Sequence, residues 1–246
     1  MRLYKLFIFT FAVIFINSCR SAPEIIQKDY EYEKMVFENH RFTFKIHLEN
    51  FNDSEKTSEL IKKLIYQNNT FDEYILFTEK KFIGDIEEED FPAMIDDDGT
   101  EYFYHSDLEE SYSIEYYNDL FVIIKYFWWA YYSGAAHGNY WCQYFILDLT
   151  DEKILDIDDL IYPIPDKLLK EIIEEEYEID YYLNEDIWPP DTISLQKDDI
   201  ILLWNTYSIA PYSTGAIQIN INDKIIESYL TEKGMKLKKS MNKQKP

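Results

Sequence analysis

Residues 127–141 read FWWAYYSGAAHGNYW, and this stretch decides the expected fold. Aromatic and β-branched residues precede it from Val122 to Tyr126 and follow it from Tyr144 to Leu147, so both flanks are typical of β-strands. The small residues between the flanks, Ser133 to Asn139, indicate the tip of a hairpin. We interpret this glycine-bearing tip as a place where a ligand binds.

Glycine is rare in the chain, with 6 in 246 residues, and it is found at Gly134 and Gly138 in this tip and at Gly215 in the loop Ala210–Gly215. Glycine permits a positive φ or the close approach of another group, although each of these residues can also serve an ordinary tight turn. We predict that the two loops meet at one end of a twisted antiparallel sheet and present a shared acidic, ring-rich face. The candidate ligand-binding residues are Tyr132, Ser133, Gly134, His137, Asn139, Tyr207, Pro211 and Tyr212.

Composition limits the function classes. Hydrophobic residues make up 46% of the chain and aromatic residues 17%, which excludes a disordered protein. The count of 47 Asp and Glu against 24 Lys and Arg gives a net charge of -23. Such a charge repels the phosphates of nucleic acids, so we expect no nucleic-acid partner, and a charged soluble partner should be cationic.

The first residues indicate the compartment. Arg2 and Lys5 precede the apolar run Leu6–Phe15, and Ile16–Cys19 ends the segment. This is the pattern of a signal peptide over residues 1–19, too short for a membrane span, and small residues before Cys19 resemble a bacterial lipobox. We predict lipidation at Cys19 and an extracytoplasmic domain anchored to the cell membrane or the outer membrane; an ordinary secretory signal is the alternative. Cys142 is then alone, and we interpret it as a small core residue.

The rest of the chain predicts an α+β fold, with two or three helices packed on a strongly twisted antiparallel sheet of long strands. Strict alternation from Phe42 to Leu48 indicates a half-buried strand, a helix follows over 54–67, and a strand meander extends over 110–147. Helices are expected from Asp166 and from Asp223. The predicted parts are the signal peptide 1–19, a tether 20–34, a first part 35–110, a second part 111–231 and a basic flexible tail 232–246.

Catalytic and metal motifs are absent from the sequence. The four histidines, His40, His47, His105 and His137, are dispersed, and no metal-binding spacing or nucleophile elbow is present. The acidic run at Asp96–Asp98 lacks the spacing of a calcium loop. We therefore assign no catalytic residue, metal or cofactor. His137 remains the histidine to test as a base, against the alternative that its ring anchors the hairpin tip.

Three motifs resemble the DUF3298 domain, also called the RsiV-like domain. The first is Tyr132–Asn139, the second is Leu147–Leu149 with Lys153–Leu155 and Asp159–Leu160, and the third is Tyr207–Gly215. The first motif usually reads Tyr-x-Gly-Gly-Ala-His, and Ala135 stands at its second glycine. Residues 35–110 are similar to the DUF4163 region that commonly precedes it, so 111–231 is the DUF3298-like part. The resemblance implies an extracytoplasmic α+β module, found in lipoproteins, in an anti-sigma factor that senses lysozyme, and beside the separate catalytic domain of polysaccharide deacetylases.

These observations favour a binding protein of the cell envelope over an enzyme. An acidic surface steers basic proteins, and lysozymes are basic, so a cationic, lysozyme-like cell-wall hydrolase is the first candidate ligand. A cell-wall glycan stacked on aromatic side chains, in an accessory module of polysaccharide modification, is the second. A hydrolase that uses His137 is the third.

Overall fold

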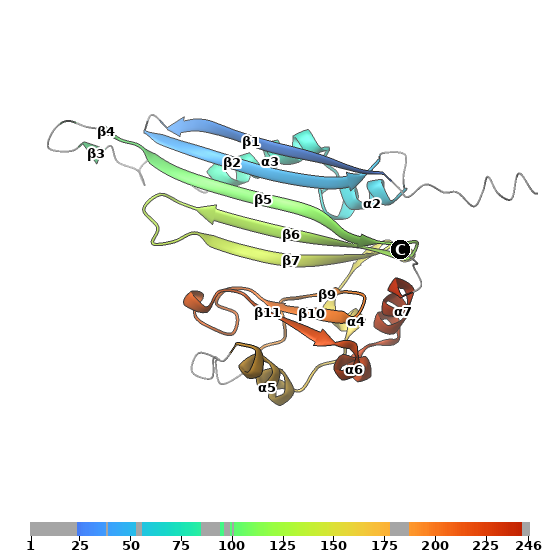
Figure 1. Ribbon diagram of the computed structural model, residues 1–246. Coiled ribbons are helices and arrows are strands. Elements are labelled where there is room, and N and C mark those ends of the chain that lie inside the picture. The colour runs from blue at the N-terminus through green and yellow to red at the C-terminus, as the bar shows by residue number, and fades with distance from the viewer. Residues whose placement is uncertain are drawn as a thin grey trace, which may run out of the picture.

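The computed structural model describes residues 24–37, 39–52, 56–84, 94–95, 99, 101–177 and 187–242. Within them, a large six-stranded sheet and a smaller three-stranded sheet lie next to each other, with helices at both ends of this arrangement (Figure 1). The predicted signal peptide, the lipidation site Cys19 and the acidic run Asp96–Asp98 lie outside the described residues. The described helices include none that is long and apolar enough to cross a membrane.

The large sheet has the strand order β1-β2-β5-β6-β7-β8. Every neighbouring pair is antiparallel except β2 and β5, which run parallel because two helices connect them across one face. A short antiparallel pair, β3 (Met94–Ile95) with β4 (Glu101–Tyr102), precedes β5. The strands of the large sheet are β1 (Ile25–Phe37), β2 (His40–Phe51), β5 (Tyr104–Tyr117), β6 (Phe121–Tyr131), β7 (Asn139–Asp148) and β8 (Lys153–Leu155).

The two connecting helices are α2 (Lys56–Leu64) and α3 (Phe71–Gly84), and both pack on the same face of the large sheet (Figure 1). Alternate residues of β2 point to this face and are buried, as the period of two in the sequence predicts. Helix α2 contributes Leu60 and Ile61 to the core between the layers, and α3 contributes Tyr74 and Ile75. The predicted packing of a helix on the strand at 42–48 is therefore confirmed.

The smaller sheet has the order β11-β10-β9, and its strands pair antiparallel. The fully buried Trp204 of β10 belongs to a core that this sheet shares with the opposite face of β6 and β7. The strands are β9 (Thr192–Leu195), β10 (Asp199–Trp204) and β11 (Ile217–Asn222). The helices around them are α4 (Ile157–Leu160), α5 (Asp166–Tyr177), α6 (Asp223–Ile226) and α7 (Glu232–Met241), with 3₁₀ turns η2 (Tyr212–Thr214) and η3 (Glu227–Tyr229).

Side chains rather than backbone strands join the smaller sheet to the edge of β7. Asn205 accepts a hydrogen bond from the Cys142 backbone N–H at 2.7 Å and donates one to the Cys142 carbonyl at 3.0 Å. Thr192 does the same for Tyr144, at 3.0 and 3.1 Å. The backbone N–H and carbonyl groups of Cys142 and Tyr144, on the edge of β7, are thus paired, and the smaller sheet is held in place beside the hairpin.

The predicted α+β class with a mainly antiparallel sheet is confirmed, while two terminal predictions are wrong. Residues from Ile25 onward form strand β1 instead of a tether. Cross-strand pairs hold its outer face, including Lys45 with Glu31 at 3.5 Å, and on its inner face the Tyr30 hydroxyl donates to Asp72 of α3 at 2.7 Å.

The basic segment predicted as a flexible tail is helical over residues 232–241, so the prediction is wrong for that part. It forms helix α7, which buries Gly234, Leu237, Lys238 and Met241 on one side. These positions follow helical spacing. Because two of them are a lysine and a glycine, however, the sequence shows no clear apolar stripe. The described residues also form more helices than the two or three expected, because α3, α4 and α7 were not predicted as helices.

Candidate functional site

The two glycine-bearing loops meet, as predicted. The hairpin tip between β6 and β7 contacts the loop between β10 and β11, where the His137 ring stacks on the Tyr212 ring with centroids 3.7 Å apart and an interplanar angle of 14°. The Tyr212 hydroxyl donates a hydrogen bond to the Gly138 carbonyl. A second link runs from the Ala216 backbone N–H to the Tyr140 hydroxyl, at 2.6 Å. Segments far apart in the chain therefore form one rigid surface element.

Close contacts require two of the glycines, Gly138 within the hairpin and Gly215 between the two loops. A Cβ at Gly138 would lie 2.6 Å from Trp129 Nε1, and one at Gly215 would lie 3.0 Å from the Tyr140 hydroxyl. Gly134 and Gly215 also have positive φ values, of 90° and 83°. The local sequence thus fits the geometry of the contact as well as that of each turn.

We call the exposed part of this contact the aromatic corner, made of His137, Asn139, Tyr207, Pro211 and Tyr212. The Tyr207 side chain is 61% exposed, and its ring lies 5.5 Å from that of Tyr212. His137 Nδ1 lies 3.0 Å from the Gly138 carbonyl, to which it donates as an anchor of the tip. The ring stack and this bond support the anchoring role of His137 over that of a base.

Three predicted site residues lie away from the corner surface. Tyr132 packs toward α3, with its ring 4.9 Å from that of Phe82. The Ser133 backbone N–H donates to Ser106 Oγ at 3.0 Å, so this residue fastens the tip to β5. Gly134 shapes the turn.

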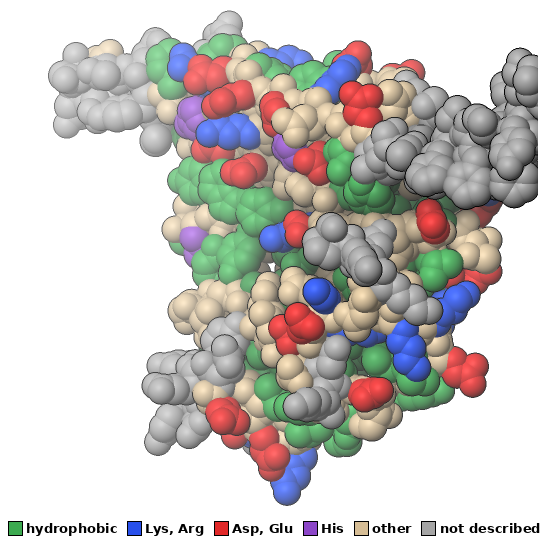
Figure 2. Space-filling model, turned by 45° about the vertical axis from the view of Figure 1, so that its right-hand side comes forward, with side chains coloured by type: hydrophobic (Ala, Val, Ile, Leu, Met, Phe, Trp, Pro, Cys, Tyr) green, Lys and Arg blue, Asp and Glu red, His purple; other side chains and the backbone are tan. Residues whose placement is uncertain are grey.

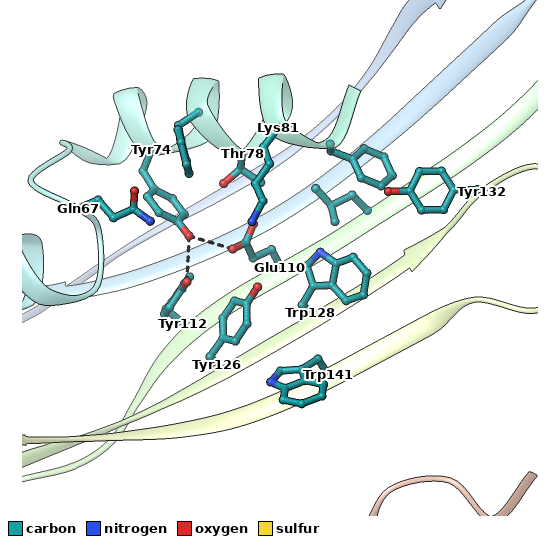
Figure 3. A pocket seen from close by; sticks show the side chains of 13 residues that line it. Gln67, Tyr74, Thr78, Lys81, Glu110, Tyr112, Tyr126, Trp128, Tyr132 and Trp141 are labelled. Carbon is teal, nitrogen blue, oxygen red and sulfur yellow. Dashed lines mark hydrogen bonds between the residues drawn. The ribbon is translucent and has the colours of Figure 1, made fainter. Parts of the chain in front are cut away.

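A pocket of about 440 Å³, which sequence reasoning missed, lies between α3 and the face of β5, β6 and β7 (Figure 3). The strand register places Glu110 beside Trp128, and Trp128 beside Trp141, in one row across the sheet. The next row begins with Tyr112 and Tyr126. Helix α3 lines the other side of the pocket with Tyr74, Phe77, Thr78 and Lys81.

Glu110 is the buried acid of this pocket, with an exposed fraction of 5%. The Tyr74 hydroxyl donates to Glu110 Oε1 at 2.9 Å, and because that hydroxyl has one hydrogen, the Tyr112 hydroxyl donates in turn to Tyr74 at 2.9 Å. Burial raises the pKa of Glu110 above its usual range, while hydrogen bonds from Tyr74, Thr78 and Tyr126 oppose that rise. Burial also raises the pKa of Tyr74 and of Tyr112, so both remain neutral donors.

A signal for this pocket was present in the sequence. In β5, buried positions alternate with more exposed ones, and Leu108, Glu110 and Tyr112 occupy buried positions. Glu110 is thus a charged residue at a position where this pattern is otherwise apolar. Buried carboxylates are rare unless their neighbours satisfy them, and such positions often mark functional sites. The partners on β6 and α3 depend on strand register and helix placement, which that pattern alone does not give.

Two further reactive side chains, those of His40 and Cys142, are buried. His40 Nε2 lies 2.9 Å from Ser106 Oγ, but both side chains are fully buried, so no substrate reaches this pair. Burial, followed by the charge of nearby His105, lowers the pKa of His40 to about 4. Cys142 is a free, buried thiol whose pKa is raised by burial, consistent with a core role. Among the described residues, no group of His, Cys, Asp or Glu is placed to hold a metal ion.

Comparison with known proteins supports the fold. A DUF3298 family member from Bacteroides fragilis has a similar crystal structure, with a TM-score of 0.64 and 20% identity over 87% of this chain and 96% of the other. A DUF3298 family protein from Pseudomonas aeruginosa gives a TM-score of 0.57 and 16% identity, with the same coverage of 87% and 96%. No curated protein matches the chain.

The sequence itself matches a family model over part of its length. The matched segment begins at the end of β7 and ends in α6, so it includes the loop that carries Tyr207 and Tyr212 but not the hairpin tip. It falls inside the part 111–231 for which the resemblance was predicted. Residues 148–224 of this chain match DUF3298, a family described as a protein of unknown function.

Proposed function

We propose that this protein is a binding module of the cell envelope, anchored through lipid on Cys19, whose aromatic corner recognises a basic protein such as a lysozyme-like cell-wall hydrolase. The observation that carries the proposal is the exposed Tyr207 ring beside the stacked pair His137 and Tyr212. Tyrosine gives a large contact area at a small cost in conformational entropy, which makes it a frequent interface anchor.

Rigidity strengthens this argument. Because Tyr212 donates to Gly138 and Tyr140 accepts from Ala216, these two rings are already held in place before a partner arrives. A preorganised surface loses less entropy on binding than a flexible loop does.

The charge of the chain supports a basic partner. The net charge is -23, and in the face drawn in Figure 2 acidic side chains are spread over both halves of the molecule, interspersed with basic ones. A distributed charge of this kind attracts a cationic protein over a distance and raises the association rate. The attraction should weaken as salt screens it.

The test uses the chain without its predicted signal peptide, called the soluble domain. It measures the binding of a basic lysozyme to this domain at low and high salt, with Tyr207→Ala as the variant. We expect the association rate to fall with salt and the dissociation constant to rise about tenfold or more in the variant, as for an interface anchor. Tyr162→Ala is the matched control, because Tyr162 is 55% exposed elsewhere on the surface. Binding that is absent, insensitive to salt, or equally weakened by both substitutions contradicts the proposal.

A further inference from the structure

We propose that the pocket between α3 and strands β5 to β7 is a saccharide-binding site, separate from the aromatic corner. In this site a sugar ring stacks on Trp141 and Trp128, and its hydroxyls bond to Glu110 and the polar groups around it. The inference does not depend on the proposed protein ligand, since the two sites share none of the residues that are argued to bind.

The open wall of the pocket is aromatic. Trp141 is 41% exposed at the mouth, and Trp128 lies beside it on the neighbouring strand. Phe77 of α3 is also exposed and faces the same space from the helix. Small-molecule sites combine apolar and aromatic walls of this kind with a few placed polar groups. A sugar ring has an apolar C–H face that fits such a wall.

The floor of the pocket is polar and already organised. Glu110 accepts a hydrogen bond from the Tyr74 hydroxyl, which in turn accepts one from the Tyr112 hydroxyl (Figure 3). Tyr126 and Thr78 also donate to the carboxylate. Burial of a carboxylate is costly, and the network around Glu110 offsets that cost. The result is a fixed acceptor surrounded by hydroxyl groups, at the depth where the hydroxyls of a stacked sugar would arrive.

Charge decides between a sugar and an organic cation. An aromatic pocket with an unneutralised acid suits an ammonium group. Here, however, Lys81 extends from α3 toward Glu110, and its positive charge favours the ionised carboxylate (Figure 3). A cationic ligand would meet Lys81 at the mouth, and an anionic ligand would meet Glu110 inside. A neutral, hydroxyl-rich ligand is compatible with both charges.

The pocket also has a suitable size and position. Its volume of about 440 Å³ lies within the usual range for small-ligand sites. Trp141 of β7 lines the pocket and is exposed, so a ring of a longer chain can stack there while the rest of the chain remains outside.

The experiment titrates the soluble domain with trisaccharides of glucose, galactose and N-acetylglucosamine, following tryptophan fluorescence and ligand-observed NMR. We expect saturable binding of at least one of them and a loss of at least tenfold in affinity in Trp141→Ala. Glu110→Gln, which keeps the shape of the side chain, should also weaken binding at least tenfold. Circular dichroism establishes that each variant is folded.

Trp188→Ala is the matched control, since Trp188 is 65% exposed outside this pocket and its loss should leave binding unchanged. Tyr207→Ala should likewise leave sugar binding intact, which separates this inference from the proposed function. The inference is overturned if none of the trisaccharides binds, if Trp141→Ala and Glu110→Gln bind as well as the wild type, or if choline and spermidine bind in place of the sugars.

Discussion

His137 and Tyr212 stack with ring centroids 3.7 Å apart, although one precedes β7 and the other follows β10. The contact joins a hairpin of the large sheet to a loop of the smaller sheet. Together with the bonds of Asn205 and Thr192 to the edge of β7, it holds the two sheets in one relative position. Substitutions at the corner should therefore affect stability as well as any ligand.

Tyr212→Phe tests the hydroxyl at this contact. The change removes the hydrogen bond to the Gly138 carbonyl but keeps the ring stack. Because that carbonyl also accepts from His137 Nδ1, it is not left unpaired, and we expect the free energy of unfolding to fall by about 0.5–1.5 kcal/mol. Urea denaturation measures the change. Tyr207→Phe makes the same chemical change on an exposed ring and should alter stability by less than about 0.5 kcal/mol; equal losses in both variants would contradict the assignment.

Gly234→Ala tests the close packing of α7 on α4. A Cβ at Gly234 would lie 2.1 Å from the Leu160 carbonyl oxygen, which belongs to backbone and cannot rotate away. Overpacking costs about 1–3 kcal/mol or more, and alanine regains about 1 kcal/mol in helix propensity. We expect a net loss of about 2 kcal/mol in the free energy of unfolding, measured by chemical denaturation.

The control for Gly234→Ala is Lys236→Ala on the exposed side of the same helix, which should be neutral within about 0.5 kcal/mol. If Gly234→Ala were as stable as Lys236→Ala, α7 would not be packed on α4 as described. A flexible tail, as predicted from the sequence, would give that result.

The sequence predicts the strands around the hairpin because their apolar residues follow a period of two or run continuously. The sequence did not predict helix α3, and the reason is physical. Its buried face includes Thr78 beside Tyr74 and Phe82, while Leu76 and Phe77 are exposed, so no clear apolar stripe marks the helix.

The two candidate sites also differ in how far the sequence predicts them. The aromatic corner could be predicted because glycine, rare in this chain, marks both of its loops. The pocket could not, because Glu110, Trp128 and Trp141 come from three strands and become neighbours only through the strand register. Lys81 and Tyr74 reach them from a helix that the sequence did not reveal. Apart from Glu110 at a buried position of its own strand, long-range pairing of this kind leaves no local pattern.

Asp148→Asn tests the ion pair that fixes the start of α7. Lys233 Nζ lies 2.5 Å from Asp148 Oδ2. Burial tends to raise the pKa of Asp148, but the bonds from Lys233 and from the backbone N–H groups of Asp151 and Thr150 hold it below its usual range. The hydrogen bonds that Lys233 donates to Asp148 and Asp151 raise the pKa of Lys233 to about 12. Asparagine keeps the oxygen that accepts from the backbone and removes the charge, with an expected loss of about 1–3 kcal/mol at pH 7.

The pH dependence of this loss follows from the direction of each shift. The carboxylate contributes fully above the usual aspartate pKa, near 3.9, and its contribution disappears as the pH falls through the lower pKa of the folded state. The lysine contributes fully below its usual pKa, near 10.4, and that contribution disappears as the pH rises through about 12. The difference in unfolding free energy between wild type and Asp148→Asn should therefore be constant from about pH 5 to 10 and shrink toward pH 2. Asp151→Asn, which removes an exposed partner of Lys233, should cost less than about 1 kcal/mol. A difference that grows on acidification would show that the Asp148 carboxylate is not stabilised by Lys233.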